Sequence, residues 1–423
     1  MSQYTGEVSF ERQVYPDGTY PGRSPSPRFF QDGCFFKTGI TAAGPLPWQE
    51  QFDEWLSRGM HGCMSYLDRQ AEKRRDVSLI LGDVRSIVVP AMNYFVDIPH
   101  GGDCLKGRIS RYAWGEDYHA FILGRLNRLL EHIRAAEPEA RGLCYVDTGP
   151  VMEKVWGAQS SLGWMGKHSN LITRELGSWF FVGVILLNLE LDYDAREKDF
   201  CGTCTRCLHA CPTGAIIAPY VVDARLCLSY LTIEWKGVIP RPLRRLLGNR
   251  VFGCDDCQDV CPWNRFAKPA PEPAFQPRPG NLTPALSSLA AITDAEFESR
   301  FSGSPVRRAR REALVRNAVV ALGNSRSLDA IPALTRALRD ASALVRGHAA
   351  WALGEVRGSA PPLRDSNRNL PAGESNAGNA LEWALFEESD PWVREEIKLV
   401  LSRFQESGIR LQTSDPGPDS AGD

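Results

Sequence analysis

The sequence predicts an α+β protein of several domains, in which a layered α/β domain, a cysteine-rich module and a helical tail follow one another. Helical and buried-strand patterns alternate over residues 46–195, eight cysteines fall between Cys201 and Cys261, and a helical pattern repeats over 301–406. The formal charge of −2 favours no class of partner. No stretch approaches the roughly 20 apolar residues that cross a bilayer, and no apolar signal segment opens the chain, so we expect a soluble, cytoplasmic monomer.

The first part of the chain divides into an irregular segment and a domain. Residues 1–45 are rich in Gly, Pro and Ser and predict little regular structure. The following alternation of helical spacing with continuous apolar runs predicts a layered α/β domain over 46–195. The expected elements are a helix from Trp48, buried strands at 86–92, 143–146 and 179–187, and an amphipathic helix at 118–134.

The cysteines predict a bacterial ferredoxin-like module with two [4Fe–4S] clusters over 196–268. The first run has the spacing C-x2-C-x2-C-x3-C-P, in which the fourth cysteine ligates the other of two clusters. The second run repeats the last three positions but lacks the first, and Cys227 is the only cysteine between the runs that can replace it. We assign one cluster to Cys201, Cys204, Cys207 and Cys261, and the other to Cys211, Cys227, Cys254 and Cys257.

Other uses of these cysteines do not fit their spacing. A zinc site usually takes four ligands as two C-x2-C pairs, which would leave Cys207 and Cys211 unexplained. A disulfide framework is typical of short secreted chains. We therefore expect a protein that moves single electrons in a reducing compartment.

A Pro-rich linker and connecting helix are expected at 269–300, before a repeat tail. Leu314-Val315-Arg316 and Leu344-Val345-Arg346 are each followed by Ala-Leu-Gly, and a third copy begins at Trp392-Val393-Arg394. Two-helix units of this length resemble HEAT repeats, expected over 301–406, with a disordered tail at 407–423. Repeat surfaces of this kind usually bind a macromolecule, and a structural buttress is the alternative.

Local clusters of arginine can contact a phosphate backbone. One cluster lies between the cysteine runs and the other precedes or begins the first repeat helix. A solvated helix face is the alternative for either cluster. The candidate contacts are Arg244, Arg245, Arg307, Arg308, Arg310, Arg311 and Arg316.

Electrons from two clusters need an acceptor, and the α/β domain is the candidate reaction chamber. Asp147 ends a predicted buried strand, where a partly desolvated carboxyl with a raised pKa could donate a proton. The alternative is a turn starter, because Asp before Thr-Gly-Pro commonly begins a turn. Neither a phosphate-loop motif nor G-x-G-x-x-G is present, so no nucleotide site is predicted.

Together these motifs resemble the epoxyqueuosine reductase family. The resemblance rests on Tyr112–His119, Val146–Glu153 and Gly163–His168, joined in order to the eight cysteines and the HEAT-like tail. It implies a cobalamin-dependent oxidoreductase that reduces epoxyqueuosine to queuosine at the wobble position of tRNA, the last step of queuosine biosynthesis. An external electron donor is also implied: a ferredoxin, a flavodoxin or a chemical reductant.

The resemblance also implies site residues. Asp147 falls on the family's proton donor, and the α/β domain becomes the cobalamin-binding catalytic domain. The start of the chain departs from the family, which usually opens with a helix and a first strand. The implied cobalamin contacts are Tyr112, Asp117, Tyr118, His119, Lys154, Lys167, His168, Ser169 and Asn170.

Two other functions stay open from the sequence. A cobalamin-dependent reductive dehalogenase would share the cofactors, but such enzymes usually carry an export signal and lack a HEAT-like tail. A non-catalytic iron–sulfur electron carrier or scaffold would bind no corrinoid and would not need Asp147. An absorption spectrum of anaerobic protein with added cobalamin distinguishes these functions.

Overall fold

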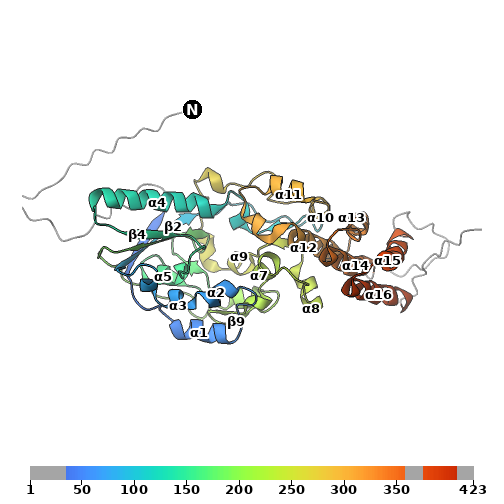
Figure 1. Cartoon of the computed structure of the whole chain (residues 1–423), viewed down its shortest axis with the longest axis horizontal. Helices are drawn as coiled ribbons and strands as arrows, with labels where there is room; N and C mark the ends of the chain where they lie inside the picture. The colour runs from blue at the N-terminus through green and yellow to red at the C-terminus, as the bar shows by residue number, and fades with distance from the viewer. Residues whose placement is uncertain (1–34, 358–374, 407–423) are drawn as a thin grey trace, which may run out of the picture.

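The computed structural model describes residues 35–357 and 375–406. Along its long axis the α/β domain, the cysteine-rich module and the helical tail follow one another (Figure 1). The predictions made for residues 1–34 and 407–423 lie outside the described residues. None of the described helices is long and apolar enough to cross a membrane.

A five-stranded antiparallel sheet forms the centre of the α/β domain, in the order β1-β2-β8-β4, with β7 also paired to β2. Strand β2 is buried along its whole length, as its apolar run predicts. The strand expected at 179–187 is instead two strands, because Gly183 interrupts it and donates its N–H to Pro90 O. The strands are β1 (Lys37–Ala42), β2 (Ser86–Asn93), β4 (Gly142–Tyr145), β7 (Phe180–Val182) and β8 (Val184–Leu187).

The expectation of an irregular segment through residue 45 was wrong at its end, because β1 lies within it. This edge strand has few apolar residues, so its pattern does not predict a strand. Its pairing with β2 places Gly39 opposite Val89. A Cβ atom at Gly39 would lie 2.1 Å from Ser160 Oγ, so the close approach of the strand requires glycine there.

The two faces of the sheet pack on different helices, as the two-residue period of a strand requires. Val88 and Ile185 face the core under α4, whereas Val89 and Leu186 face the core beside α5. The loop of the short β5–β6 hairpin carries residues 166–170. The elements around the sheet are α1 (Gln49–Ser57), α2 (Ser65–Arg69), α3 (Ala71–Arg75), α4 (Tyr118–Ala136), α5 (Glu153–Gln159), β5 (Trp164–Met165) and β6 (Leu171–Ile172).

Short elements separate the cysteines in the module. Strand β11 pairs in parallel with β3 (Arg108–Ile109) of the α/β domain, which joins the two parts through backbone hydrogen bonds. The module contains α6 (Arg206–Ala210), β9 (Ile216–Ala218), β10 (Val221–Val222), α7 (Leu228–Ile233), α8 (Arg241–Arg244), β11 (Arg250–Phe252) and α9 (Asp256–Asp259).

The tail is a stack of helices in which α12 packs on α14 and α14 packs on α16. Each of these three helices carries one copy of the Val-Arg motif, so the helices repeat as the sequence predicts. The tail and its approach contain α10 (Leu286–Ala290), α11 (Asp294–Arg300), α12 (Arg310–Ser325), α13 (Ile331–Ala337), α14 (Ala343–Arg357), α15 (Ser375–Glu387) and α16 (Pro391–Glu406).

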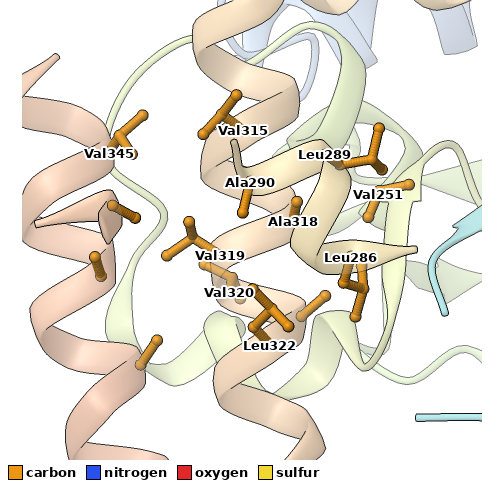
Figure 2. Packing of buried hydrophobic residues seen from close by; sticks show 14 of the residues in the cluster. Val251, Leu286, Leu289, Ala290, Val315, Ala318, Val319, Val320, Leu322 and Val345 are labelled. Atoms are coloured by element: carbon orange, nitrogen blue, oxygen red, sulfur yellow. The ribbon is translucent and has the colours of Figure 1, made fainter. Parts of the chain in front are cut away.

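One hydrophobic core continues from the module into the tail. Leu286 and Leu289 of α10 gather with Val251 of β11 and Ala318 of α12, all fully buried, and Val345 of α14 extends this core further along the tail (Figure 2). The segment after the cysteines therefore does not act as a free spacer, because α10 packs on the first repeat helix. This packing fixes the start of the tail beside the module.

Candidate functional site

A cavity of about 1990 Å³ lies where the α/β domain, the module and the start of the tail meet. It exceeds the roughly 300–1,000 Å³ of most small-molecule pockets. We call it the central cavity. It brings together most of the predicted cofactor contacts with the proton-donor candidate: Tyr112, Asp117, Tyr118, His119, Asp147, Lys154, His168, Ser169 and Asn170.

Asp147 lies in the loop that follows β4, in the left-handed backbone conformation with φ of 53°. Asp adopts this conformation more readily than most residues. The Tyr118 hydroxyl donates a hydrogen bond to the Asp147 carboxylate, and the Asp147 N–H donates to Glu153 Oε1 at 3.0 Å. The aspartate is thus held at the cavity wall through both its side chain and its main chain.

The most desolvated acid of this site is Glu153 rather than Asp147. Asp147 is exposed to the cavity, whereas Glu153 is only 8% exposed. Burial, followed by the negative charge of Asp147, raises the pKa of Glu153 to about 8, and positively charged Arg74 offsets part of this. Glu153 was not among the predicted site residues. Its signal was the buried face that it shares with Trp156 on α5.

Asp117 and His119 form the start of α4. The Asp117 carboxylate accepts the His119 N–H at 3.0 Å and lies 2.6 Å from His119 Nδ1, so it caps the helix. Between them Tyr118 stacks on Phe181 with ring centroids 4.1 Å apart. Burial and then the charge of Asp147 raise the pKa of Tyr118, and the same causes raise that of Tyr112. Both hydroxyls therefore remain protonated hydrogen-bond donors at neutral pH.

The loop between β5 and β6 also lines the cavity. Burial, then the positive charge of Lys154, lowers the pKa of His168 to about 4, so this ring is neutral at pH 7. Its Nδ1 faces the N–H of Asn170 at 3.2 Å, which places the ring proton on Nε2. Nε2 is buried and has no hydrogen-bond partner among the described residues. Lys154 Nζ donates to Asn170 Oδ1 at 2.8 Å, and Ser169 Oγ donates to Tyr220 O at 3.0 Å.

Lys167 does not line the central cavity, which corrects its prediction as a cofactor contact. Its Nζ instead donates to Gly202 O at 2.6 Å and to Cys204 O at 3.0 Å. The lysine is buried against the first cysteine run and stabilises that loop.

The second cysteine group, Cys211, Cys227, Cys254 and Cys257, lines the central cavity with all four members. Burial is the main cause that raises the pKa of Cys257, and the neighbouring Cys254 and Cys227 raise it further. The Ala215 N–H also donates to Cys211 Sγ at 3.2 Å, a contact suited to a thiolate.

None of the first cysteine group, which consists of Cys201, Cys204, Cys207 and Cys261, lines the central cavity. Burial is the main cause that raises the pKa of Cys207, and the neighbouring Cys201 and Cys261 raise it further. Cys201 and Cys261 pack with Trp164, Phe200 and Trp263 in a small aromatic cluster. The thiols that act on Cys207 thus belong to its own predicted group.

Four of the candidate arginines reach the central cavity. Arg307 and Arg308 form ion pairs with Glu298 and Glu234 respectively. Arg311 is held more firmly, by Asp340 at 2.5 Å and by Ile292 O at 2.9 Å. The fourth, Arg310, is exposed and forms no ion pair within the described ranges.

The other three arginines do not lie at this cavity, and the prediction that Arg244 and Arg316 contact RNA was wrong. Both are almost completely buried. The Arg316 guanidinium donates to main-chain oxygens of the module, including Leu231 O at 2.8 Å, and Arg244 forms a bidentate pair with Glu396. Arg245 pairs with Glu355 at 2.6 Å, away from the cavity. Arg316 belongs to the repeat motif and joins the first repeat helix to the module, whereas the motif arginines Arg346 and Arg394 bind Glu388 and Leu385 O within the tail.

Three family models match the chain in this order. "Epoxyqueuosine reductase QueG, DUF1730" matches residues 74–148, "4Fe-4S double cluster binding domain" matches 200–264, and "HEAT repeats" matches 306–370. The chain is 43% identical to the epoxyqueuosine reductase of Cellulophaga algicola, over 67% of this chain and 92% of that protein. It is 42% identical to that of Xanthomonas campestris pv. campestris, over 77% of this chain and 93% of that protein.

Solved structures agree with these relatives. An epoxyqueuosine reductase bound to an epoxyqueuosine-modified tRNA-Tyr stem loop matches at 30% identity and a TM-score of 0.79, covering 89% of this chain and 97% of that one. A second, from Bacillus subtilis with its aspartate catalytic loop swung out of the active site, matches at 29% identity and a TM-score of 0.78, over 89% and 96%. The chain, an oxidoreductase with a double-cluster domain and HEAT repeats, belongs to the epoxyqueuosine reductase family.

Proposed function

We propose that this protein reduces epoxyqueuosine in tRNA to queuosine, using two [4Fe–4S] clusters and a cobalamin bound in the central cavity. The carrying observation is that one cavity is lined by the second cysteine group, by Asp147 and by arginines of the tail. Two electrons and two protons convert the epoxide to a carbon–carbon double bond and one water molecule. The electrons arrive from an external donor through the module, and the protons arrive at the cavity.

The first and second cysteine groups are the proposed ligands of the two clusters. Their support is the spacing of the motif, the neighbours of Cys207 and Cys257, and the N–H groups directed at sulfur. Main-chain N–H groups of Tyr230 and Ser229 also face Cys227 and lower its pKa, against the larger effect of burial. Such donors stabilise thiolates in a cluster and tune its potential.

The central cavity fits a corrinoid in size and in its donors. Its volume exceeds that of ordinary pockets, and His168 Nε2 is a buried donor that has no partner among the described residues. A corrinoid carries amide side chains whose oxygens can accept from this nitrogen, from Lys154 and from Asn170. When bound, cobalamin supplies a low-valent cobalt that delivers electrons to the epoxide.

Asp147 is the proposed proton donor to the departing oxygen. It is exposed to the cavity, and the Tyr118 hydroxyl and the Glu153 carboxyl fix its position. General acid catalysis of this kind typically contributes about 100- to 10,000-fold. Glu153 is mostly protonated at neutral pH because of its raised pKa, but its side chain is buried. Asp147 is therefore the acid that faces the substrate.

The arginines at the cavity are the proposed contacts for the RNA backbone. Arg310, Arg307 and Arg308 are exposed there, and they neutralise phosphates without reading bases. Arg311 has a structural role through Asp340.

We propose that the enzyme acts as a cytoplasmic monomer.

An anaerobic turnover assay with a stem-loop RNA tests this function. Protein reconstituted with iron and sulfide should remove one oxygen atom from epoxyqueuosine, seen by mass spectrometry, only when both a reductant and cobalamin are present. Turnover without cobalamin would contradict the cofactor, and no turnover with all components would contradict the reaction.

A further inference from the structure

A second cavity, of about 840 Å³, lies beside the first cysteine group. Cys261 lines it, together with Thr205, Arg206 and His209 of the segment that also carries Cys207. All four members of the second group line the central cavity instead. The second cavity is therefore bordered by a member of the first group, and the central cavity by the whole of the second group.

The lining of the second cavity is positively charged. Arg206, His209 and Arg265 are exposed there, and neither arginine forms an ion pair with any residue that the structure describes. The acidic residue of the lining, Asp259, is paired with Arg111 at 2.7 Å. The free positive charge is thus not neutralised by the protein itself.

An exposed aromatic ring adjoins this charge. Phe266 is 40% exposed, and the Arg265 guanidinium lies over its ring at 4.5 Å from the centroid. Arginines and aromatic rings are enriched where proteins bind one another. A group of exposed basic residues beside an exposed aromatic side chain suits a protein partner with an acidic face.

We infer that this surface docks a small acidic one-electron carrier protein and that electrons enter the molecule through the first cysteine group. The inference rests on the proposed function, because it needs clusters at both cysteine groups. In each encounter the reduced carrier loses one electron and the first cluster gains it. Two encounters therefore supply the two electrons that reduce one epoxide. No bond forms or breaks at this surface, and the protons enter at the central cavity.

The placement also separates the two macromolecular partners. The arginines proposed to contact RNA line the central cavity, whereas Arg206 and Arg265 line the second. A carrier and a tRNA can then bind at the same time. Opposite charges on carrier and enzyme speed their encounter and make it sensitive to salt.

A charge-reversed double variant, Arg206→Glu with Arg265→Glu, tests the inference. The probe is a reduced plant-type ferredoxin, whose potential of about −400 mV suits a donor to such clusters. We expect its binding to the variant to weaken at least about tenfold at low salt, and its KM to rise equally, because like charges then face each other. Turnover driven by dithionite and affinity for the RNA stem-loop should match the wild type.

The matched control is Arg128→Glu with Arg134→Glu, two exposed arginines of α4 that line neither cavity. Equal ferredoxin binding by wild type and the test variant would overturn the inference. So would weakened RNA binding, which would make this surface an RNA contact. Failure of the proposed function is separate, because it would abolish dithionite-driven turnover in the wild type while ferredoxin binding is still measured.

Discussion

Replacing Glu153 by Gln should remove an alkaline limit on turnover. Glu153 Oε1 accepts the Asp147 N–H at 3.0 Å, and burial beside Asp147 raises the pKa of Glu153 to about 8. Gln keeps the accepting oxygen and resembles the protonated acid. In the wild type, ionisation of Glu153 above pH 8 places a buried negative charge beside the loop that carries Asp147, which should displace this loop.

The magnitude follows from that pKa. With a pKa of about 8, Glu153 is about 91% protonated at pH 7 and about 9% protonated at pH 9, so the ratio of variant to wild-type kcat should rise about tenfold between these pH values. Stability should change too. The pKa of Glu153 in the folded protein exceeds its ordinary value of 4.5. Its contribution to the free energy of unfolding is therefore complete below pH 4.5 and is lost as the pH rises to 8. At about 1.4 kcal/mol per pH unit, this contribution is at most about 5 kcal/mol.

The assay is single-turnover reduction of a stem-loop RNA with excess dithionite between pH 6 and 9.5, as an approximate range that brackets the pKa. Denaturant midpoints over the same range measure stability. Glu131→Gln, at an exposed position of α4, is the matched control. An alkaline limb that is the same in wild type and Glu153→Gln would refute this reasoning, as would midpoints with the same pH dependence.

Three further changes test the site. Asp147→Asn should lower turnover at least about 100-fold while cobalamin and RNA binding persist, and unchanged turnover would remove Asp147 from the mechanism. Cys227→Ala should reduce iron from about eight to about four atoms per chain, whereas Cys104→Ala, a control outside both groups, should retain all of it. Charge reversal of the exposed cavity arginines, Arg307, Arg308 and Arg310, should weaken RNA binding and flatten its salt dependence without changing base preference. An unchanged salt slope would mean that these arginines contact only solvent.

Much of the fold follows from patterns that one local rule controls. The apolar run at 86–92 becomes β2, and the helical spacing from residue 118 becomes α4, because each element buries a continuous apolar face. The repeated Val-Arg pairs also predicted the stacked helices correctly. Asp147, Tyr118 and His168 reach one cavity although they lie far apart in the sequence.

The errors lie where a side chain's role depends on distant segments. Strand β1 gains its order from pairing with β2 rather than from its own apolar residues. Arg316 is buried because the module packs against the first repeat, and Lys167 turns toward the first cysteine run. Glu153 could have been found from its helical spacing with Trp156, whereas its raised pKa depends on the buried site around it.

The most direct test is an anaerobic structure of the reconstituted enzyme with cobalamin and a stem-loop RNA that carries epoxyqueuosine. The account predicts a cubane on Cys211, Cys227, Cys254 and Cys257 at the wall of a central cavity that holds the corrinoid. It also predicts the Asp147 carboxyl within hydrogen-bond reach, about 2.6–3.2 Å, of the epoxide oxygen. A corrinoid outside this cavity, or an epoxide approached by a different acid, would contradict it.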